Sequence, residues 1–268
     1  MAHGDEALSW RIRRGVLEQS KRANVGHIGS ALSIADLLAA LFGGVLRISD
    51  SADPERDRFV LSKGHAALAL HVALHAIGKV NDEELASFCR DGSRFATHPE
   101  HAIAGVDFST GSLGQGLSFG TGAALGAQMQ GSQRRAFVLM SDAECNEGSV
   151  WEAVMFAAHH QLGNLIALVD VNGQQALGNT RDILDLAPMS TRWLAFGWDV
   201  HEVDGHDVAA LKALIQRLSP VDSRPHVLLA DTTFGRGVSY MESTLAWHYL
   251  PMSDAQYASA LSELGDCP

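Results

Sequence analysis

Five apolar runs of strand length recur along the chain, and segments with helical spacing of apolar residues separate them. The runs occupy residues 58–62, 135–140, 164–171, 198–204 and 226–232. Helical spacing is found in residues 6–22, 33–48, 66–78 and 149–163. Continuous apolar strands that alternate with helices are typical of a parallel sheet buried on both faces. The pattern therefore predicts an α/β fold, a parallel twisted sheet covered by helices on both faces.

The pattern contains no long linker, low-complexity tract or internal repeat. We therefore expect residues 1–268 to form a single domain. Only the segment from Tyr249 onward is less patterned. We expect these roughly 20 residues to form a less ordered tail, which a partner could order.

Composition and charge narrow the class of protein. Apolar residues make up 46% of the chain and charged residues 19%, and no stretch reaches the roughly 18 apolar residues of a membrane span. The net charge of −11 disfavours nucleic acid as a partner, because neutralising phosphates requires clustered Lys and Arg. The three cysteines are scattered, and the N-terminus lacks a signal-peptide pattern. We expect a cytoplasmic protein that binds neither membranes nor nucleic acid.

Polar residues follow several of the predicted strands, at the edge of a parallel sheet where ligands bind. Asp142 follows one strand, Asn172 follows the next, and a helix lies between them. A right-handed strand-helix-strand unit brings these two ends together, so a carboxylate and an amide oxygen can bind one hard cation such as Mg²⁺ or Ca²⁺. Such a cation usually bridges to phosphate, which implies a diphosphate ligand. Taken singly, Asp142 could instead cap a helix and Asn172 could form a turn.

The residues around this pair resemble the thiamine-diphosphate signature of transketolases. The signature begins with Ser141-Asp142-Ala143, where the family has Gly-Asp-Gly, and ends at Asn172. Further segments resemble transketolases in the family's order, namely residues 26–30, 59–65, 97–100, 110–116, 235–241 and 247–248. The resemblance covers nearly the whole chain.

The resemblance implies a role for each matching residue. Asp142, Asn172 and the carbonyl of Gln174 would bind the metal, Mg²⁺ or else Ca²⁺ or Mn²⁺. The diphosphate would be contacted by His65, His248 and the amide of Ala143. Leu113 and Gly114 would lie against the thiamine rings, and Glu147 would lie at a subunit interface unless it only favours the start of a helix. His27, His98 and His248 would face the substrate and move protons, because the histidine pKa lies near neutrality.

The resemblance also implies that this chain is one of two different subunits that are both needed for activity. Transketolases build the cofactor site between a diphosphate-binding and a pyrimidine-binding part, and the second supplies the glutamate that activates the aminopyrimidine. This chain resembles the N-terminal subunit of a split transketolase, whose partner would be a C-terminal pyrimidine-binding subunit in an α2β2 heterotetramer. The activity implied is transfer of a two-carbon ketol unit from a ketose, as a phosphate or modified sugar, to an aldehyde. A decarboxylase, a 1-deoxyxylulose-phosphate synthase-like enzyme and a catalytically impaired structural homologue remain alternatives.

Two departures from the family pattern concern the predicted site. Ser141 and Ala143 replace glycines, and an alanine at a position with positive φ would be strained by about 1 kcal/mol. Tyr249, Leu250 and Pro251 replace small residues near the substrate entrance. His71 and His75 lack a third ligand nearby, and the adjacent His159 and His160 face different directions on a helix, so we assign no site to either pair.

Overall fold

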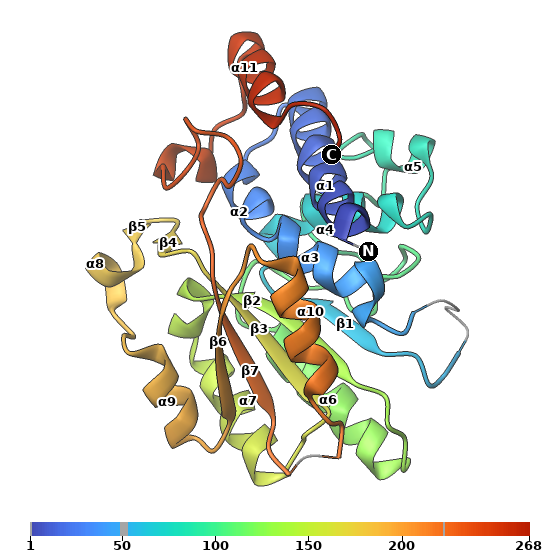
Figure 1. Cartoon of the computed structure of the whole chain (residues 1–268), viewed down its shortest axis with the longest axis vertical. Coiled ribbons are helices and arrows are strands. Elements are labelled where there is room, and N and C mark those ends of the chain that lie inside the picture. Colours follow the sequence, from blue (N-terminus) through green and yellow to red (C-terminus); the bar gives the residue numbers. More distant parts are fainter. Residues whose placement is uncertain (1, 49–52, 222) are drawn as a thin grey trace.

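The computed structural model describes residues 2–48, 53–221 and 223–268. Five strands form one sheet in the order β1-β2-β3-β7-β6, and every neighbouring pair is parallel (Figure 1). The strands are β1 (Arg58–Leu61), β2 (Ala136–Ser141), β3 (Leu165–Val171), β6 (Asp199–Asp204) and β7 (His226–Asp231). The parallel α/β sheet predicted from the apolar runs is confirmed.

Alternate residues of the strands pack into two separate hydrophobic cores. In β2, Phe137 and Leu139 join one core, whereas Val138 and Met140 join the other. Successive side chains of a strand point to opposite faces, so a run that is apolar throughout is needed to bury both faces. This is why β2, β3 and β7 appear in the sequence as nearly continuous apolar runs, whereas the edge strand β6 contains polar residues and is only partly buried.

Helices cover both faces of the sheet. On one face lie α1 (Ala2–Ala23), α3 (Ala35–Ala40), α4 (Ala67–Ala76) and α10 (Val208–Arg217), and Figure 1 shows α10 crossing in front of the sheet. The other face packs against α6 (Gly116–Met129), α7 (Gly148–His159) and α9 (Met189–Ala195). The shorter elements are α2 (Ile28–Ser33), the π-helix η1 (Leu41–Val45), α5 (Asp82–Ala86), α8 (Thr180–Leu184), a hairpin of β4 (Gln174–Gln175) and β5 (Gly178–Asn179), and the 3-10 helices η2 (Gly64–Ala66), η3 (Ala143–Asn146) and η4 (Leu245–His248).

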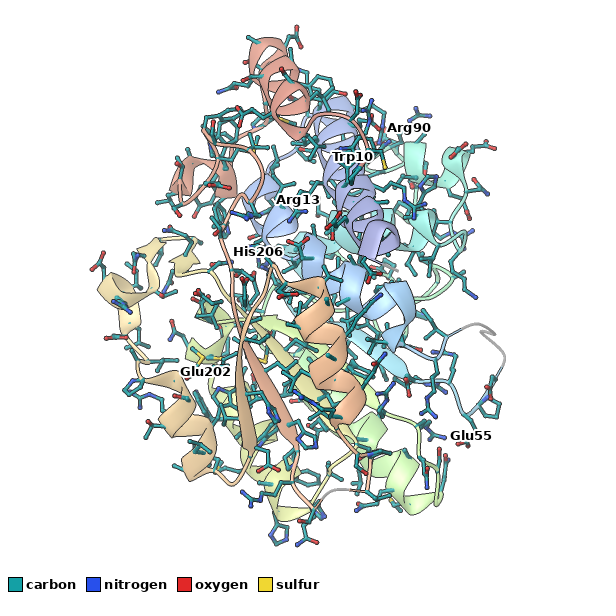
Figure 2. All side chains as sticks on the ribbon, viewed as in Figure 1. Trp10, Arg13, Glu55, Arg90, Glu202 and His206 are labelled. Atoms are coloured by element: carbon teal, nitrogen blue, oxygen red, sulfur yellow. The ribbon has the colours of Figure 1, made fainter. Side chains whose placement is uncertain are left out.

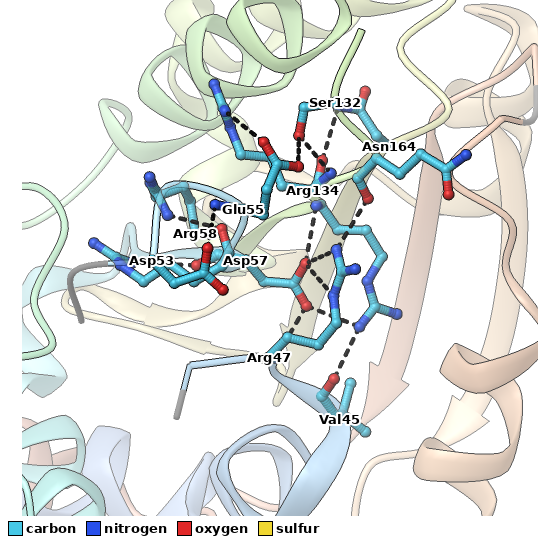
Figure 3. A network of polar contacts seen from close by, with 12 residues as sticks. Val45, Arg47, Asp53, Glu55, Asp57, Arg58, Ser132, Arg134 and Asn164 are labelled. Carbon is cyan, nitrogen blue, oxygen red and sulfur yellow. Dashed lines mark hydrogen bonds and ion pairs between the residues drawn. The ribbon is translucent and has the colours of Figure 1, made fainter. Parts of the chain in front are cut away.

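A buried carboxylate joins the amino-terminal ends of β1 and β2. The side chain of Asp57 is 0% exposed and forms ion pairs with Arg47 and Arg135 (Figure 3). It also accepts hydrogen bonds from the backbone N–H groups of the same two arginines, at 3.1 and 3.0 Å. Although burial alone would raise the pKa of Asp57, these hydrogen bonds and charges lower it. The network holds the amino-terminal ends of β1 and β2 together. Ligands are expected at the other end of these strands, beyond their carboxyl ends.

The last part of the chain differs from the expected tail, because it contains the helix α11 (Asp254–Leu264). Ser253 and Gln256 form a capping box at the start of this helix. Ala260 is buried, and Tyr257 and Leu261 pack against the larger hydrophobic core. The capping box is readable in the sequence and indicates a helix start.

No helix within the described residues combines the length and the apolar character that a membrane span requires.

Candidate functional site

Asp142 and Asn172 lie directly after the neighbouring strands β2 and β3. The buried Asp142 carboxylate accepts hydrogen bonds from the N–H groups of Ala143 and Gly173, each at 2.8 Å. The bond to Gly173 holds the carboxylate beside Asn172. Burial, and after it the charge of Asp170, raise the pKa of Asp142 to about 7. A bound cation would stabilise the charged form of this buried carboxylate, and the carboxylate and amide oxygens at these two strand ends fit a divalent cation.

Asp170 and Lys63 lie behind Asn172 and fix the orientation of its amide. The Asn172 Nδ2 donates to Asp170 Oδ2 at 2.8 Å and to Ser33 Oγ at 3.2 Å. Asp170 also accepts hydrogen bonds from the hydroxyls of Ser33 and Thr232 and from the Lys63 ammonium. The side chains of Lys63 and Asp170 are 1% and 0% exposed. Because the amide nitrogen is fully engaged on this side, its oxygen is left as the acceptor at the strand ends.

Three predicted histidines form a triangle of rings. The ring centroids of His27 and His65, and of His27 and His248, lie 5.3 Å apart, and those of His65 and His248 lie 5.5 Å apart. Burial, together with the charge of Lys63, lowers the pKa of all three, to about 2 for His65 and about 4 for His248. The three rings are therefore neutral near pH 7. Within the described residues, the buried Nδ1 atoms of His27 and His248 lack a hydrogen-bond partner, which a ligand could supply.

His27 has a left-handed backbone conformation, with φ 60° and ψ 20°, at the start of α2. Such a conformation is uncommon for a residue other than glycine and clusters at functional sites. The N–H of His27 donates to the carbonyl of His248 at 3.2 Å. The backbone thus links two histidines that lie far apart in the sequence.

His65 and His98 both contact Ser112, in the glycine-rich segment 111–116. Because His65 is neutral, its Nδ1–H donates to the Ser112 carbonyl at 3.2 Å and its Nε2 accepts from Ser30 Oγ at 3.1 Å. His98 Nε2 lies 2.9 Å from Ser112 Oγ. This segment therefore holds both histidines beside the strand ends.

Glu144 fixes the same glycine-rich segment from behind. Its side chain is fully buried and accepts hydrogen bonds from Ser62 Oγ, from the N–H of Gly114 at 2.7 Å and from the N–H of Ser141 at 3.2 Å. Gly114 has φ +83°, a conformation that glycine adopts without strain. Glu144 thus joins the ends of β1 and β2 to the loop.

One cavity of about 270 Å³ brings most of the predicted site residues together. Those lining it are His27, His65, Leu113, Ala143, Glu147, Asn172, Gln174 and His248. Asp142 lines an adjoining cavity of about 850 Å³, which Asn172 also lines. Gly114 is buried behind the wall, and His98 reaches the cavity through Ser112. The predicted residues therefore surround one region at the carboxyl edge of the sheet.

The two glycine replacements do not strain the backbone. Ser141 ends β2 and Ala143 begins η3, and neither has a positive φ. Glu147 is exposed and stands at the start of α7 without a side-chain capping hydrogen bond. The strain expected from Ala143 is absent because η3 is a right-handed turn that alanine adopts readily.

Residues 5–268 match the model of a protein family described as "Transketolase, thiamine diphosphate binding domain". The chain belongs to the transketolase family.

The matching relatives include transketolase subunits that are covered over almost their whole length and a longer transketolase-like protein that is covered only in part. A subunit of the apulose-4-phosphate transketolase of Phocaeicola vulgatus is 37% identical, with 97% of this chain and 94% of the relative covered. The 6-deoxy-6-sulfo-D-fructose transketolase subunit SqwG of Clostridium sp. is 38% identical, with 94% and 93% covered. Transketolase-like protein 2 of Mus musculus is 38% identical over 90% of this chain, but only 39% of that protein is covered.

Solved transketolases share the fold. The structure from Campylobacter jejuni has a TM-score of 0.89 at 27% identity and covers 98% of this chain. The Pichia stipitis transketolase in complex with sedoheptulose-7-phosphate has a TM-score of 0.89 at 31% identity and also covers 98%. The chain spans 43% and 41% of the lengths of these two structures.

Three residues inside the transketolase-like motifs support the predicted site residues, although the sequence led us to expect no role for them. Lys63 and Asp170 form the buried pair beneath Asn172, and Glu144 holds the glycine-rich segment. Lys63 precedes the motif residue His65 by two positions, and Glu144 lies inside the signature. A charged residue within an otherwise apolar strand, as Asp170 is, was the signal that could have marked Asp170 as a buried carboxylate in need of a partner, but it does not identify Lys63 as that partner.

A separate cavity of about 490 Å³ lies between α1 and the loop after β6. Arg13 and His206, both labelled in Figure 2, bond to the carboxylate of Asp36. Burial alone would raise the pKa of Asp36, but the hydrogen bond from His206 and the Arg13 charge lower it to about 2. Within the described residues, no group of three His, Cys, Asp or Glu side chains is placed to hold a metal ion. We assign no ligand to this cavity.

Proposed function

We propose that this chain is the diphosphate-binding subunit of a two-component transketolase, which transfers a two-carbon ketol unit only when joined by a pyrimidine-binding subunit. One observation carries the proposal. The chain matches, over 93–94% of their length, relatives whose names describe them as transketolase subunits. The donor belongs to the class of ketoses that are phosphorylated or otherwise modified, and the acceptor is an aldehyde.

Asp142, Asn172 and the carbonyl of Gln174 would hold a divalent cation, Mg²⁺ or else Ca²⁺ or Mn²⁺. The oxygen ligands suit a hard cation, and the buried negative charge around Asp142 supports its binding. The amide orientation of Asn172, set by Asp170, supports the same role. The cation would neutralise the diphosphate of the cofactor.

His65, His248 and the N–H of Ala143 would contact that diphosphate, while Leu113 and the backbone of Gly114 would lie against the thiamine rings. The fit is supported by His65, Ala143 and His248 lining one cavity, and by the buried Nδ1 of His248, which has no hydrogen-bond partner within the described residues. Glu147, exposed beside the same cavity, would lie at the interface with another subunit.

His27, His98 and His248 would orient the substrate hydroxyls and move protons. When bound, thiamine diphosphate supplies the carbon nucleophile and stabilises the two-carbon fragment. The lowered pKa values of His27 and His248 keep these rings neutral, so a ring nitrogen can accept a hydrogen bond from a substrate hydroxyl.

The second subunit would supply the glutamate that activates the aminopyrimidine, and two copies of each chain would form an α2β2 heterotetramer. Exposed apolar side chains on α6 and α7 support an interaction with other chains. Phe119 is 39% exposed, Met155 50% and Phe156 43%. Apolar residues gathered on neighbouring helices are typical of subunit interfaces.

The test is reconstitution. This chain and its candidate partner are purified separately, and ketol transfer from xylulose 5-phosphate to ribose 5-phosphate is measured with Mg²⁺ and thiamine diphosphate. We expect transfer by the mixture and none by either chain alone. Ketol transfer by this chain alone would contradict the need for a partner. Release of CO₂ from pyruvate by the mixture, without ketol transfer, would replace the transferase with a decarboxylase, and calorimetry without thiamine diphosphate binding would indicate a structural homologue.

A further inference from the structure

Tyr249 connects the two sides of the cavity. It follows His248, and its hydroxyl donates a hydrogen bond to the carbonyl of Ala176, which lies 73 positions earlier in the sequence. Ala176 belongs to the turn of the β4–β5 hairpin, and both residues line the same cavity as His248 and Gln174. The bond therefore spans from the histidine side of the cavity to the hairpin side.

The β4–β5 hairpin forms the wall that follows Asn172. Its first strand begins at Gln174, whose N–H donates to Asn172 Oδ1 at 3.0 Å. The hairpin has only two residues in each strand, and a hairpin of that size has little stability of its own. Helix α8, which follows it, has no buried residue among the described ones, and Leu177 at the hairpin turn is 74% exposed. A segment with so few buried contacts opens easily.

Tyr249, in contrast, has a firmly fixed backbone. Its N–H donates to the carbonyl of Ala246 at 3.1 Å, at the end of η4. Its carbonyl oxygen lies so close to Gly26 that a Cβ added there would come within 2.2 Å of it. The neighbouring His248 carbonyl accepts the hydrogen bond from the N–H of His27. Tyr249, whose backbone is fixed, therefore holds Ala176, which belongs to the weakly supported hairpin.

On the other side of the cavity, the hairpin has weaker support. Gln175 Nε2 lies 3.5 Å from Asn146 Oδ1, and Asn146 Nδ2 lies 3.4 Å from the carbonyl of Leu184. Both distances are at the long end of the hydrogen-bond range. The hydrogen bond from the Tyr249 hydroxyl to Ala176 therefore joins a weakly supported hairpin to the histidine side of the cavity.

We propose that Tyr249 is a positioning residue, which fastens the β4–β5 hairpin over the cavity and thereby holds the Gln174 carbonyl in place and slows release of the cofactor. The inference rests on the proposed assignment of this cavity to the cation and the diphosphate. Tyr249 acts through the hairpin, so its hydroxyl contacts neither the reacting group nor the cation.

The test compares a variant that lacks the Tyr249 hydroxyl with a control variant that lacks the hydroxyl of another tyrosine. Tyr249→Phe keeps the ring and loses the tie to Ala176. Tyr240→Phe is the control, because the Tyr240 hydroxyl also donates to a backbone carbonyl, that of Gln256 at 2.8 Å, yet Tyr240 does not line the cavity. Both are made in the full chain, and Tyr249→Leu, which removes the ring as well, is a second variant in case the single hydroxyl has a small effect.

Two measurements decide the matter. Hydrogen exchange of the chain should be about five- to tenfold faster in residues 174–184 of Tyr249→Phe, which is the effect of one lost hydrogen bond, and unchanged there in Tyr240→Phe. In the assembled pair, thiamine diphosphate should dissociate faster by a similar factor, so that the KM for the cofactor rises while kcat at saturating cofactor stays within about twofold of wild type.

The outcomes separate this inference from the proposed function. Equal exchange in residues 174–184 of wild type, Tyr249→Phe and Tyr249→Leu, or faster exchange spread evenly over the chain, would overturn it. If the assembled pair fails to transfer ketol units, the proposed function fails, but hydrogen exchange of the chain still decides whether Tyr249 fastens the hairpin.

Discussion

Lys63 and Asp170 form an ion pair that is closed to solvent, with side-chain exposures of 1% and 0%, directly beneath the amide of Asn172. Removing one charge of such a pair leaves the other buried without compensation. We therefore expect Lys63→Met to lower the free energy of unfolding by about 3–5 kcal/mol, measured by urea denaturation of the cofactor-free chain.

The double variant Lys63→Met with Asp170→Asn is the control for this prediction. The asparagine removes the uncompensated charge and keeps an oxygen that Ser33 and Thr232 can reach. It should recover more than half of the lost stability. Equal stability of wild type and Lys63→Met would show that the pair contributes nothing to the fold.

Asp142 offers the most direct test of the cation site. Because its carboxylate is the only full negative charge among the proposed ligands, Asp142→Ala should weaken Mg²⁺-dependent binding of thiamine diphosphate by at least about 100-fold, more than the loss of a residue that only orients a ligand. Calorimetry on the assembled pair measures this affinity.

Asp231→Ala is the matched control for Asp142→Ala. Asp231 ends β7 at the same edge of the sheet and lines the adjoining cavity, but it is exposed and has no proposed role. It should bind the cofactor as wild type does. Similar losses in both variants would indicate a general effect of negative charge at this edge and would remove Asp142 from the ligand set.

The sequence predicted the sheet because strands that are buried on both faces must be apolar throughout. It also predicted which residues gather at the strand ends, since the motifs place His27, His65, Asn172 and His248 in one cavity. The contacts that hold these site residues in place could not be predicted in the same way. The contacts of Lys63 with Asp170 and of Tyr249 with Ala176 join positions 107 and 73 residues apart, and no local pattern encodes such a pairing.

The variant Asp57→Ala tests whether the stability of the chain can be changed without a change in cofactor binding. Its buried carboxylate pairs with Arg47 and Arg135 at the edge of the sheet opposite the proposed site. Asp57→Ala should therefore lower the free energy of unfolding by about 3 kcal/mol or more, measured by urea denaturation, and leave the affinity for thiamine diphosphate unchanged.

Asp82→Ala is the control for Asp57→Ala. The Asp82 side chain is 98% exposed and pairs with His75, so its loss should change stability by less than about 0.5 kcal/mol. A stability loss in Asp57→Ala no larger than in Asp82→Ala would contradict a structural role for the Asp57 network.

His71 should make the stability of the chain depend on pH. Its ring is fully buried between Phe88 and Phe95, and neither ring nitrogen has a hydrogen-bond partner within the described residues. Burial lowers the pKa of His71 to about 4, from 6.5 when unfolded. The unfolded chain therefore takes up a proton first as the pH falls below 6.5, and stability declines from there until the folded chain is also protonated, near pH 4.

The decline attributable to His71 amounts to about 2 kcal/mol between pH 7.5 and pH 5. His71→Leu removes the titrating group, so its free energy of unfolding should exceed that of wild type by about 2 kcal/mol more at pH 5 than at pH 7.5, as measured by urea denaturation at both values. His75→Asn, one helical turn away, changes a partly exposed histidine and should show no such gain. A gain that is the same at both pH values would mean that leucine only improves packing, and that His71 does not titrate on unfolding.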